Sequence, residues 1–292
     1  DYDFGETYNL RYKKLVDLTA VNSVAVNDIN NECQCLTLDP PGDSFCKNGR
    51  PIKIDFGGIF EVDRQIRFCN NCVLTFQENS EVFVKQGGEL ELNGTYLYSC
   101  GSKLWKGITV EAGGHLIIDE GTIISDALFG INIKPGAIVE IKNSYLNDNY
   151  IGINLNNGAK LDLIENTTIQ TLNSVKPTNH LNAEYWSQYT YCGILLNPGS
   201  FLNMGQDYNG QSSVNHFKNI NLGIYAQSST VLCSNANFEG IQKRLPWVSQ
   251  VGSAIYLKNS LYNFIWKNNI NSSFDGIRGY KSALLCEENT ID

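Results

Sequence analysis

The residues from Gly87 to Ile169 repeat one pattern of apolar and polar positions. In each repeat a glycine precedes an alternating apolar run, which is followed by a turn and then by a strand containing Gly-Ile-x-apolar. The glycines that open the repeats are spaced 26, 23 and 22 residues apart, and they are Gly87, Gly113, Gly136 and Gly158. A fixed period of this size predicts a solenoid in which each repeat stacks on the next.

Within each repeat the apolar residues recur at every second position, which is the period of a β-strand and not of a helix. A unit of about 22 residues with three short strands is typical of one coil of a parallel β-helix. We therefore predict an all-β fold, a right-handed parallel β-helix solenoid of about eight coils. The residues expected to point inward are Leu90, Leu92, Leu116, Ile118, Val139, Ile141, Leu161 and Leu163.

Two columns of turn residues support this prediction. The first follows the second strand of each coil and contains only Gly or Asn, which tolerate a positive φ; its members are Gly94, Gly121, Asn143, Asn166 and Asn235. The second precedes the Gly-Ile strand and contains Asp126, Asp148 and Asn219, whose side chains are expected to accept hydrogen bonds from corner amides. A calcium ion shared by Asp126 and Asp148 is the alternative, although hard cations usually take more oxygen ligands.

The repeat divides the chain into two parts. Residues 1–50 lack it and are predicted to form a cysteine-containing N-terminal cap or lead-in segment, because the open first coil of a solenoid needs cover. Residues 51–292 are predicted to form the β-helix, which we expect to continue or to be capped beyond the chain end. Three loop excursions interrupt the period, and they span residues 170–191, 205–213 and 242–252.

Composition excludes two classes of partner. The chain has 292 residues, a net charge of −8 and a pI of about 5.0. An acidic chain lacks the basic surface that nucleic acid requires, so no nucleic-acid partner is expected. No run of 18 apolar residues occurs, so no membrane span is predicted.

Nine cysteines are many for a reducing compartment. Six of them fall in the first hundred residues and are predicted to form disulfides in a secreted protein; they are Cys33, Cys35, Cys46, Cys69, Cys72 and Cys100. Zinc bound by Cys33, Cys35, Cys69 and Cys72 is the alternative. Since the remaining three cannot all pair, at least one of Cys192, Cys233 and Cys286 should be a thiol.

The positions expected to point outward from the Gly-Ile strands carry no pair of acids and no base. They are Thr109, Asn132, Asn154, Leu195, Tyr225 and Tyr256. Glycoside hydrolysis needs two carboxyl groups flanking the scissile bond. The histidines, His115, His180 and His216, fall in different coils with no evident acid or nucleophile as a partner. The sequence therefore predicts no catalytic residue and favours a non-catalytic protein.

Aromatic residues gather in the excursions and on two outward strand positions. Trp186, Tyr225, Tyr256 and Trp247 are the candidate ligand-binding residues, because aromatic rings stack on sugars and anchor protein partners. The alternative is that these rings cover one side of the solenoid as a satellite core. No cofactor is expected apart from the calcium alternative.

The segments Leu104–Val110, Gly113–Leu116 and Ser125–Ala127, with Gly130-Ile131, resemble β-helix segments of large secreted surface proteins of Bacteroidota, with a pectate-lyase-like fold. The resemblance implies export by type IX secretion and attachment at the outer cell surface, in the cell outer membrane. It implies an adhesin, a stalk or a partner-binding β-helix that meets a protein or glycan there. A polysaccharide lyase or glycoside hydrolase, and an accessory subunit of a cell-surface or secretion assembly, are the alternatives. The sequence motifs of polygalacturonases and pectate lyases are absent.

Overall fold

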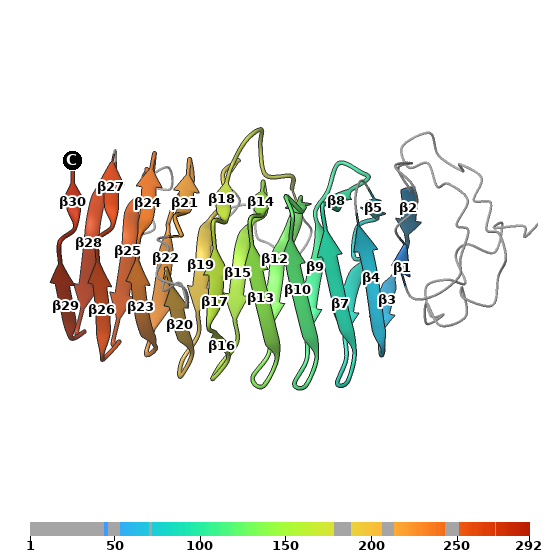
Figure 1. Cartoon of the computed structure of the whole chain (residues 1–292). Coiled ribbons are helices and arrows are strands. Elements are labelled where there is room, and N and C mark those ends of the chain that lie inside the picture. The colour runs from blue at the N-terminus through green and yellow to red at the C-terminus, as the bar shows by residue number, and fades with distance from the viewer. Residues whose placement is uncertain are drawn as a thin grey trace, which may run out of the picture.

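The computed structural model describes residues 44–45, 53–69, 72–177, 188–205, 213–242, 251–271 and 273–292 (Figure 1). These residues form thirty strands and contain no helix, and every strand pairing among them is parallel. The strands stack along one axis from β1 to β30, as the colour gradient from blue to red shows in Figure 1. The prediction of an all-β parallel solenoid is confirmed.

Four parallel sheets form the walls of the solenoid. Sheet I contains β1 (Ser44–Phe45), β4 (Gln65–Cys69), β7 (Glu89–Asn93), β10 (His115–Asp119), β13 (Ile138–Lys142) and β17 (Leu163–Glu165). Sheet II contains β2 (Lys53–Phe56), β5 (Val73–Phe76), β8 (Tyr96–Ser99), β11 (Ile123–Ser125), β14 (Tyr145–Asn147), β18 (Thr168–Gln170), β21 (Asn215–Lys218), β24 (Ala236–Glu239), β27 (Asn269–Asn271) and β30 (Thr290–Ile291).

Sheet III contains β3 (Ile59–Val62), β6 (Glu81–Val84), β9 (Trp105–Val110), β12 (Ala127–Ile133), β15 (Ile151–Leu155), β19 (Cys192–Leu196), β22 (Ile224–Gln227), β25 (Ser253–Lys258) and β28 (Asp275–Tyr280). Sheet IV contains β16 (Lys160–Leu161), β20 (Phe201–Met204), β23 (Thr230–Ser234), β26 (Asn263–Trp266) and β29 (Leu284–Glu287). Sheet IV continues the wall that sheet I begins, because β13 contacts β16 and β17 contacts β20.

The stack is longer than the predicted eight coils, since sheet II has ten strands and sheet III has nine. It also includes part of the segment predicted as a cap. Ser44 and Phe45 of β1 pair with Arg67 and Phe68 of β4, so the solenoid begins before residue 51. The division at residue 50 otherwise stays a prediction, because residues 1–43 and 46–50 lie outside the described part of the chain.

Stacked apolar columns form the core. On six successive strands of sheet III, from β9 to β25, an isoleucine lies directly above its equivalent in the next coil. All six are fully buried: Ile108, Ile131, Ile153, Ile194, Ile224 and Ile255. On sheet I, Leu116 pairs with Leu90 and with Val139, as the alternation predicts. Burying such columns of apolar side chains is the main stabilising contribution in a solenoid.

One inward prediction is wrong. Leu161 is buried, but Leu163 is partly exposed and Ile164 takes the core position, where it pairs with Ile141. The strand is divided at Asp162 into β16 and β17, so one extra residue separates the two inward side chains. Because side chains alternate in a strand, one added residue moves every later side chain to the other face.

Both predicted turn columns are present. The φ angles of the Gly/Asn column are all positive, between 44° for Asn143 and 80° for Gly121. Asp126, Asp148 and Asn219 also have positive φ angles, of 59°, 53° and 52°. The corner of each coil is therefore made by a left-handed residue, which allows the chain to change direction without a long loop.

Buried asparagines hold the inner corners. Asn149 accepts a hydrogen bond from the Ala127 amide at 2.8 Å and donates one to the Ile124 carbonyl at 2.9 Å. Asn215 makes the equivalent pair of bonds to the Thr167 amide and the Ile164 carbonyl, each at 3.0 Å. These side chains satisfy backbone groups that would otherwise be buried without a partner.

The cysteines fall into two groups. Cys192, Cys233 and Cys286 are thiols, as predicted for at least one of them, and Cys233 is fully buried between Met204 and Ile265. Burial raises the pKa of the Cys233 thiol, so it packs as a small apolar group. Cys72 is buried as a thiol, contrary to its predicted disulfide. Cys100 is buried and disulfide-bonded, as predicted. Cys33, Cys35, Cys46 and the Cys69 side chain lie outside the described residues, so which cysteines pair with one another stays a prediction.

Candidate binding groove on sheet III

The outer surface of sheet III carries one continuous column of residues in register. The column contains Phe83, Thr109, Asn132, Asn154, Leu195, Tyr225, Tyr256 and Arg278. All six residues predicted to point outward from the Gly-Ile strands therefore belong to it. Its central part changes along the solenoid, from the polar residues Thr109, Asn132 and Asn154 to the apolar and aromatic residues Leu195, Tyr225 and Tyr256.

Amide side chains of neighbouring coils are hydrogen-bonded into a ladder. Asn132 donates to the Thr109 hydroxyl at 3.1 Å, and Asn154 donates to the Asn132 carbonyl at 2.8 Å. Asn156 also donates to Asn132, at 2.6 Å, and Asn197 donates to the Asn154 carbonyl at 2.9 Å. We call Asn132, Asn154, Asn156 and Asn197 the amide ladder. Each side-chain amide has two donor hydrogens and two acceptor lone pairs. The hydrogen bonds of the ladder fix the orientation of the amides and do not use all of their donors and acceptors.

An open groove with a volume of about 820 Å³ lies beside the ladder. Its lining is apolar where the strands begin and rich in amides where they end. The lining residues are Leu128, Phe129, Lys134, Pro135, Tyr150, Ile151, Asn154, Asn156, Asn157, Tyr191, Leu195 and Asn197. A concave site with an apolar part and a few oriented polar groups is the usual form of a small-ligand site.

Two stacked tyrosines line the groove together with Phe129. The rings of Tyr150 and Tyr191 are 5.5 Å apart and 11° from parallel. The Tyr191 amide donates to the Tyr150 carbonyl at 2.8 Å, which joins the end of the first excursion to the preceding coil. Burial raises the pKa of Tyr150, so its hydroxyl is neutral at physiological pH.

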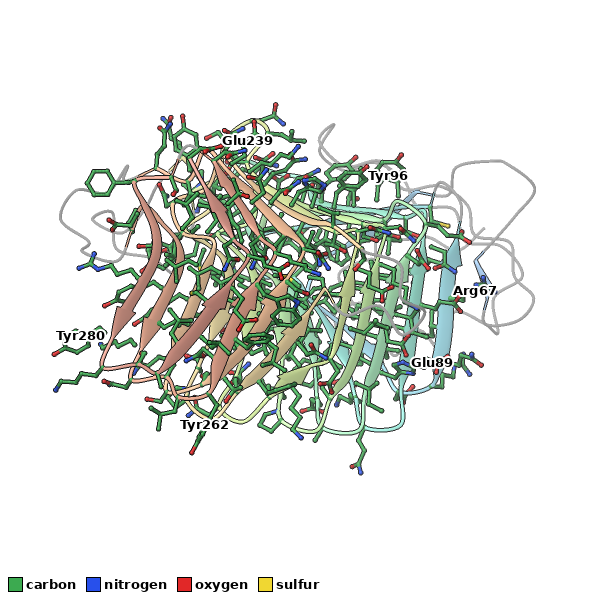
Figure 2. All side chains as sticks on the ribbon, turned by 60° about the vertical axis from the view of Figure 1, so that its left-hand side comes forward. Arg67, Glu89, Tyr96, Glu239, Tyr262 and Tyr280 are labelled. Carbon is green, nitrogen blue, oxygen red and sulfur yellow. The ribbon has the colours of Figure 1, made fainter. Side chains whose placement is uncertain are left out.

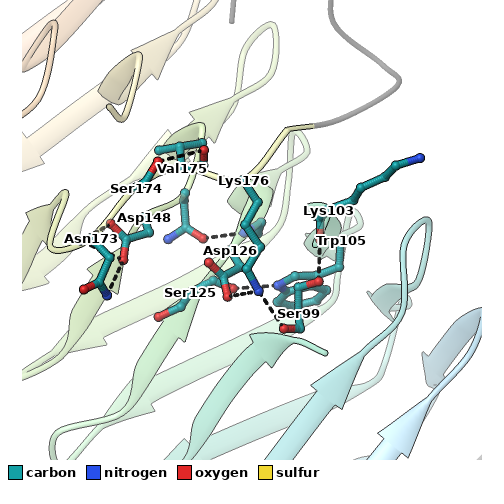
Figure 3. Close-up of polar contacts among 12 residues, drawn as sticks. Ser99, Lys103, Trp105, Ser125, Asp126, Asp148, Asn173, Ser174, Val175 and Lys176 are labelled. Carbon is teal, nitrogen blue, oxygen red and sulfur yellow. Dashed lines mark hydrogen bonds and ion pairs between the residues drawn. The ribbon is translucent and has the colours of Figure 1, made fainter. Parts of the chain in front are cut away.

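An ion pair and hydrogen bonds from backbone amides hold the start of that excursion on the corner of the solenoid (Figure 3). Asp148 accepts hydrogen bonds from the amides of Leu172 and Asn173, at 2.8 and 3.1 Å, as the corner prediction requires. Lys176 Nζ lies 2.9 Å from Asp126 Oδ2 and donates to the Ser99 carbonyl at 2.9 Å. Both predicted calcium ligands thus contact protein groups, and calcium binding stays an untested alternative.

We expect the substitution Lys176→Met to raise the pKa of Asp126. Burial already raises this pKa above 3.8, and the Lys176 hydrogen bond and charge oppose that effect. The folded carboxyl holds its proton more tightly than the unfolded one. The free energy of unfolding therefore falls as the pH rises past 3.8, and in the variant the fall should extend to higher pH. A carbon-13 NMR titration of the Asp126 carboxyl measures the shift. The exposed Lys160→Met substitution, which also removes one positive charge, is the control. An unchanged pKa of Asp126 in the Lys176→Met variant would contradict the prediction.

The predicted aromatic site is described only in part. Tyr225 and Tyr256 lie on adjacent strands with their rings 5.4 Å apart, and the Arg278 guanidinium is 5.5 Å from the Tyr256 ring centre. Tyr256 is only 9% exposed and packs with Leu104, Val175 and Leu222 in a satellite apolar cluster. For Tyr256 the satellite-core alternative is therefore the better interpretation. Trp186 and Trp247 lie outside the described residues.

The residues that line the groove were not predicted as binding residues. Asn154 and Leu195 were predicted only as outward positions. The signal that was available is the repetition of Asn on the Gly-Ile strands at Asn132 and Asn154, and just beyond them at Asn156 and Asn197. Lateral contact between these amides depends on strand register, which the sequence pattern indicates but does not specify at the excursions.

The groove has no acid pair for catalysis. Lys134 is the one charged residue among its described lining residues, and none of them is acidic. No group of three or more metal-ligating side chains occurs in the described part of the chain. Among the same residues no helix is long and apolar enough to cross a membrane.

One histidine expectation is wrong. On the separate wall of sheet I, His115 Nδ1 lies 3.0 Å from Glu89 Oε2, and Nε2 lies 3.4 Å from Glu140 Oε1. His115 therefore has acidic partners, which the sequence separation of more than twenty residues concealed. His216 lies on the outer side of β21, and His180 is outside the described residues.

Comparison of the chain with protein-family models, with curated proteins and with solved structures finds no match.

Proposed function

We propose that this chain is a non-catalytic extracellular β-helix that binds a neutral glycan in the groove on sheet III. The observation that carries the proposal is the pairing of the Tyr150–Tyr191 stack with the amide ladder in one groove. The apolar C–H face of a sugar ring packs on an aromatic ring, and its hydroxyls need both donors and acceptors, which amides supply.

The charge of the groove supports a neutral ligand. Lys134 Nζ lies 3.4 Å from the side-chain oxygen Oδ1 of Asn156. The one cation among the described lining residues is therefore hydrogen-bonded to a side-chain amide. A polyanion would require several cations in the groove. The lining also gives a lyase or hydrolase no pair of carboxyl groups to use as acid and base.

The cellular setting of the proposal comes from the sequence. The resemblance of Leu104–Val110 and Gly113–Leu116 to secreted Bacteroidota surface proteins supports export through a type IX system and display as an adhesin or partner-binding protein. Labelling of intact cells of the source organism with an antibody to this chain tests it. Signal only after cell lysis would contradict surface display.

Soluble neutral oligosaccharides test the groove. We expect the protein to bind at least one of them in a glycan array, with the affinity then measured by calorimetry. The substitution Tyr191→Ala should weaken binding at least ten-fold because the stacked ring is lost. Tyr191→Phe keeps the ring and should bind nearly as the parent does. Asn154→Leu should also weaken binding because it interrupts the amide ladder between Asn132 and Asn197.

Three outcomes would overturn the proposal. They are no binding of any soluble neutral glycan by the parent protein, unchanged affinity in both the Tyr191→Ala and Asn154→Leu variants, and release of new reducing ends or unsaturated products from a bound glycan. Equal thermal midpoints for parent and variants are the control for folding.

A further inference from the structure

A second surface of the solenoid carries a continuous column of uncharged side chains. It lies on the outer side of sheet II, with one residue on each of the nine strands from β5 to β30, and we call it the outer column of sheet II. Its residues are Val73, Tyr96, Ile123, Tyr145, Thr168, His216, Asn237, Asn269 and Thr290. Each is paired in register with the next.

Two tyrosines of this column project into solvent. Tyr96 and Tyr145 are 41% and 43% exposed, whereas Leu97 and Leu146, the residues that follow them, are each 1% exposed and belong to the core. Figure 2 shows Tyr96 at the edge of the molecule, directed away from the solenoid. Neither hydroxyl makes a hydrogen bond to another described residue. The large exposed rings are therefore not explained by packing within the described part of the chain.

The spacing of the two rings is set by the fold. Tyr96 and Tyr145 both pair with Ile123, so exactly one strand separates them. Neighbouring strands lie about 4.8 Å apart, which places equivalent atoms of the two tyrosines about 9.6 Å apart along the solenoid axis. This distance is close to the length of two sugar units in an extended β-linked polysaccharide, so both rings can lie under alternate sugars of one chain.

The charge of the column favours a neutral occupant. None of its nine residues is charged at neutral pH, since burial together with the Lys218 charge lowers the pKa of His216 below its ordinary value of 6.5. Among the neighbouring outward positions from β5 onward, charges occur only in the later coils, where Lys218 Nζ lies 4.0 Å from Glu239 Oε2; the first strand of the sheet, β2, carries Lys53 and Asp55. Around Tyr96 and Tyr145 the neighbours on the same strands are Tyr98 and Asn147, which are also uncharged. An acidic chain with a net charge of −8 thus presents an uncharged aromatic track.

We propose that the outer column of sheet II binds a neutral, extended β-linked polysaccharide that lies along the solenoid axis, with Tyr96 and Tyr145 stacked on alternate sugars. A flat track one side chain wide fits a linear polymer. A specific protein interface usually needs a central buried cluster and a total area of about 1,200–2,000 Å², whereas this column is one side chain wide. The proposal does not depend on the groove of sheet III, because the two surfaces share no residue.

Insoluble β-1,4-linked glucan and chitin are the probes for this surface. We expect the 292-residue protein to be retained on at least one of these polymers and not on granular starch, which has α-linkages. The double substitution Tyr96→Ala/Tyr145→Ala should lower the retained fraction at equal protein concentration at least ten-fold. Tyr96→Phe/Tyr145→Phe should preserve retention because the ring faces remain. Tyr262→Ala is the matched control, since Tyr262 is 82% exposed but lies outside both surfaces.

The outcomes separate this proposal from the groove. The Tyr191→Ala variant should bind the insoluble polymer as the parent does, even if it loses soluble oligosaccharides. Failure of the parent to bind either polymer, or equal retention of the double alanine variant, would overturn the proposal. So would conversion of a dimer to a monomer by the double substitution in light scattering, because the column would then be a self-association surface. Circular dichroism melts of all variants verify folding.

Discussion

The substitution Gly107→Ala is expected to lower the free energy of unfolding by more than about 3 kcal/mol, because the added Cβ conflicts with backbone that cannot move away. Gly107 has a φ of +104°, and a Cβ at this position would lie 1.6 Å from the Phe129 carbonyl oxygen. The obstructing atom is backbone of β12, whose register shifts between Phe129 and Ile131 where it pairs with β9. Because β12 is hydrogen-bonded on its other side to β15, it cannot move away without breaking that pairing.

Gly87→Ala is the matched control for Gly107→Ala. Gly87 also has a positive φ, of 78°, but no atom lies within 4 Å of an added Cβ. This substitution should cost only the strain of a left-handed alanine, about 1–2 kcal/mol. Urea denaturation followed by circular dichroism measures both. Similar midpoints for the two variants would show that close approach of β12 to Gly107 does not determine stability.

Removal of the Trp105 side chain is the second large effect that we expect. Trp105 is fully buried, and its ring stacks on Phe76 of the neighbouring coil at 4.1 Å and 10°. Its indole nitrogen donates a hydrogen bond to the Ser125 carbonyl at 2.7 Å. Trp105→Ala should therefore destabilise the protein by about 3–5 kcal/mol, because it leaves a cavity between coils and an unpaired carbonyl.

Trp105→Phe separates the two contributions. It keeps a ring on Phe76 and removes the indole hydrogen bond, so we expect a loss of about 1–2 kcal/mol. Thermal and urea unfolding measure both variants. If Trp105→Ala unfolded at the parent's midpoint, the stack between Phe76 and Trp105 would not contribute to the joining of these coils.

These core predictions bear on both proposed binding surfaces. In a solenoid each coil contacts mainly its neighbours, so a packing defect between two coils destabilises mainly those coils. The stacked pairs Phe76–Trp105 and Phe217–Phe238 keep successive coils in register inside the solenoid. The same register places Asn132 beside Asn154, and it leaves one strand, β11, between Tyr96 and Tyr145. The geometry of the outer surfaces is therefore a consequence of inner packing.

The repeat by itself determined the class of fold and much of its detail. Alternation of apolar residues with a period of 22–26 residues is enough to specify parallel strands in stacked coils. The Gly/Asn turn column, the Asp column and the outward set from Thr109 to Tyr256 were all predicted. Each follows from a local rule, either the side-chain alternation of a strand or the backbone preference of one residue type.

Tertiary structure alone decided what the local rules do not contain. The extra residue at Asp162 moved Leu163 out of the core, and nothing in the alternating pattern marks where a strand divides. His115 contacts Glu89 and Glu140 because its strand, β10, pairs with the strands of the two adjacent coils. The groove arose because an excursion returned Tyr191 to stack on Tyr150. These contacts join residues more than twenty positions apart, so they depend on the register between coils, which is set by the whole packed stack and not by any one segment.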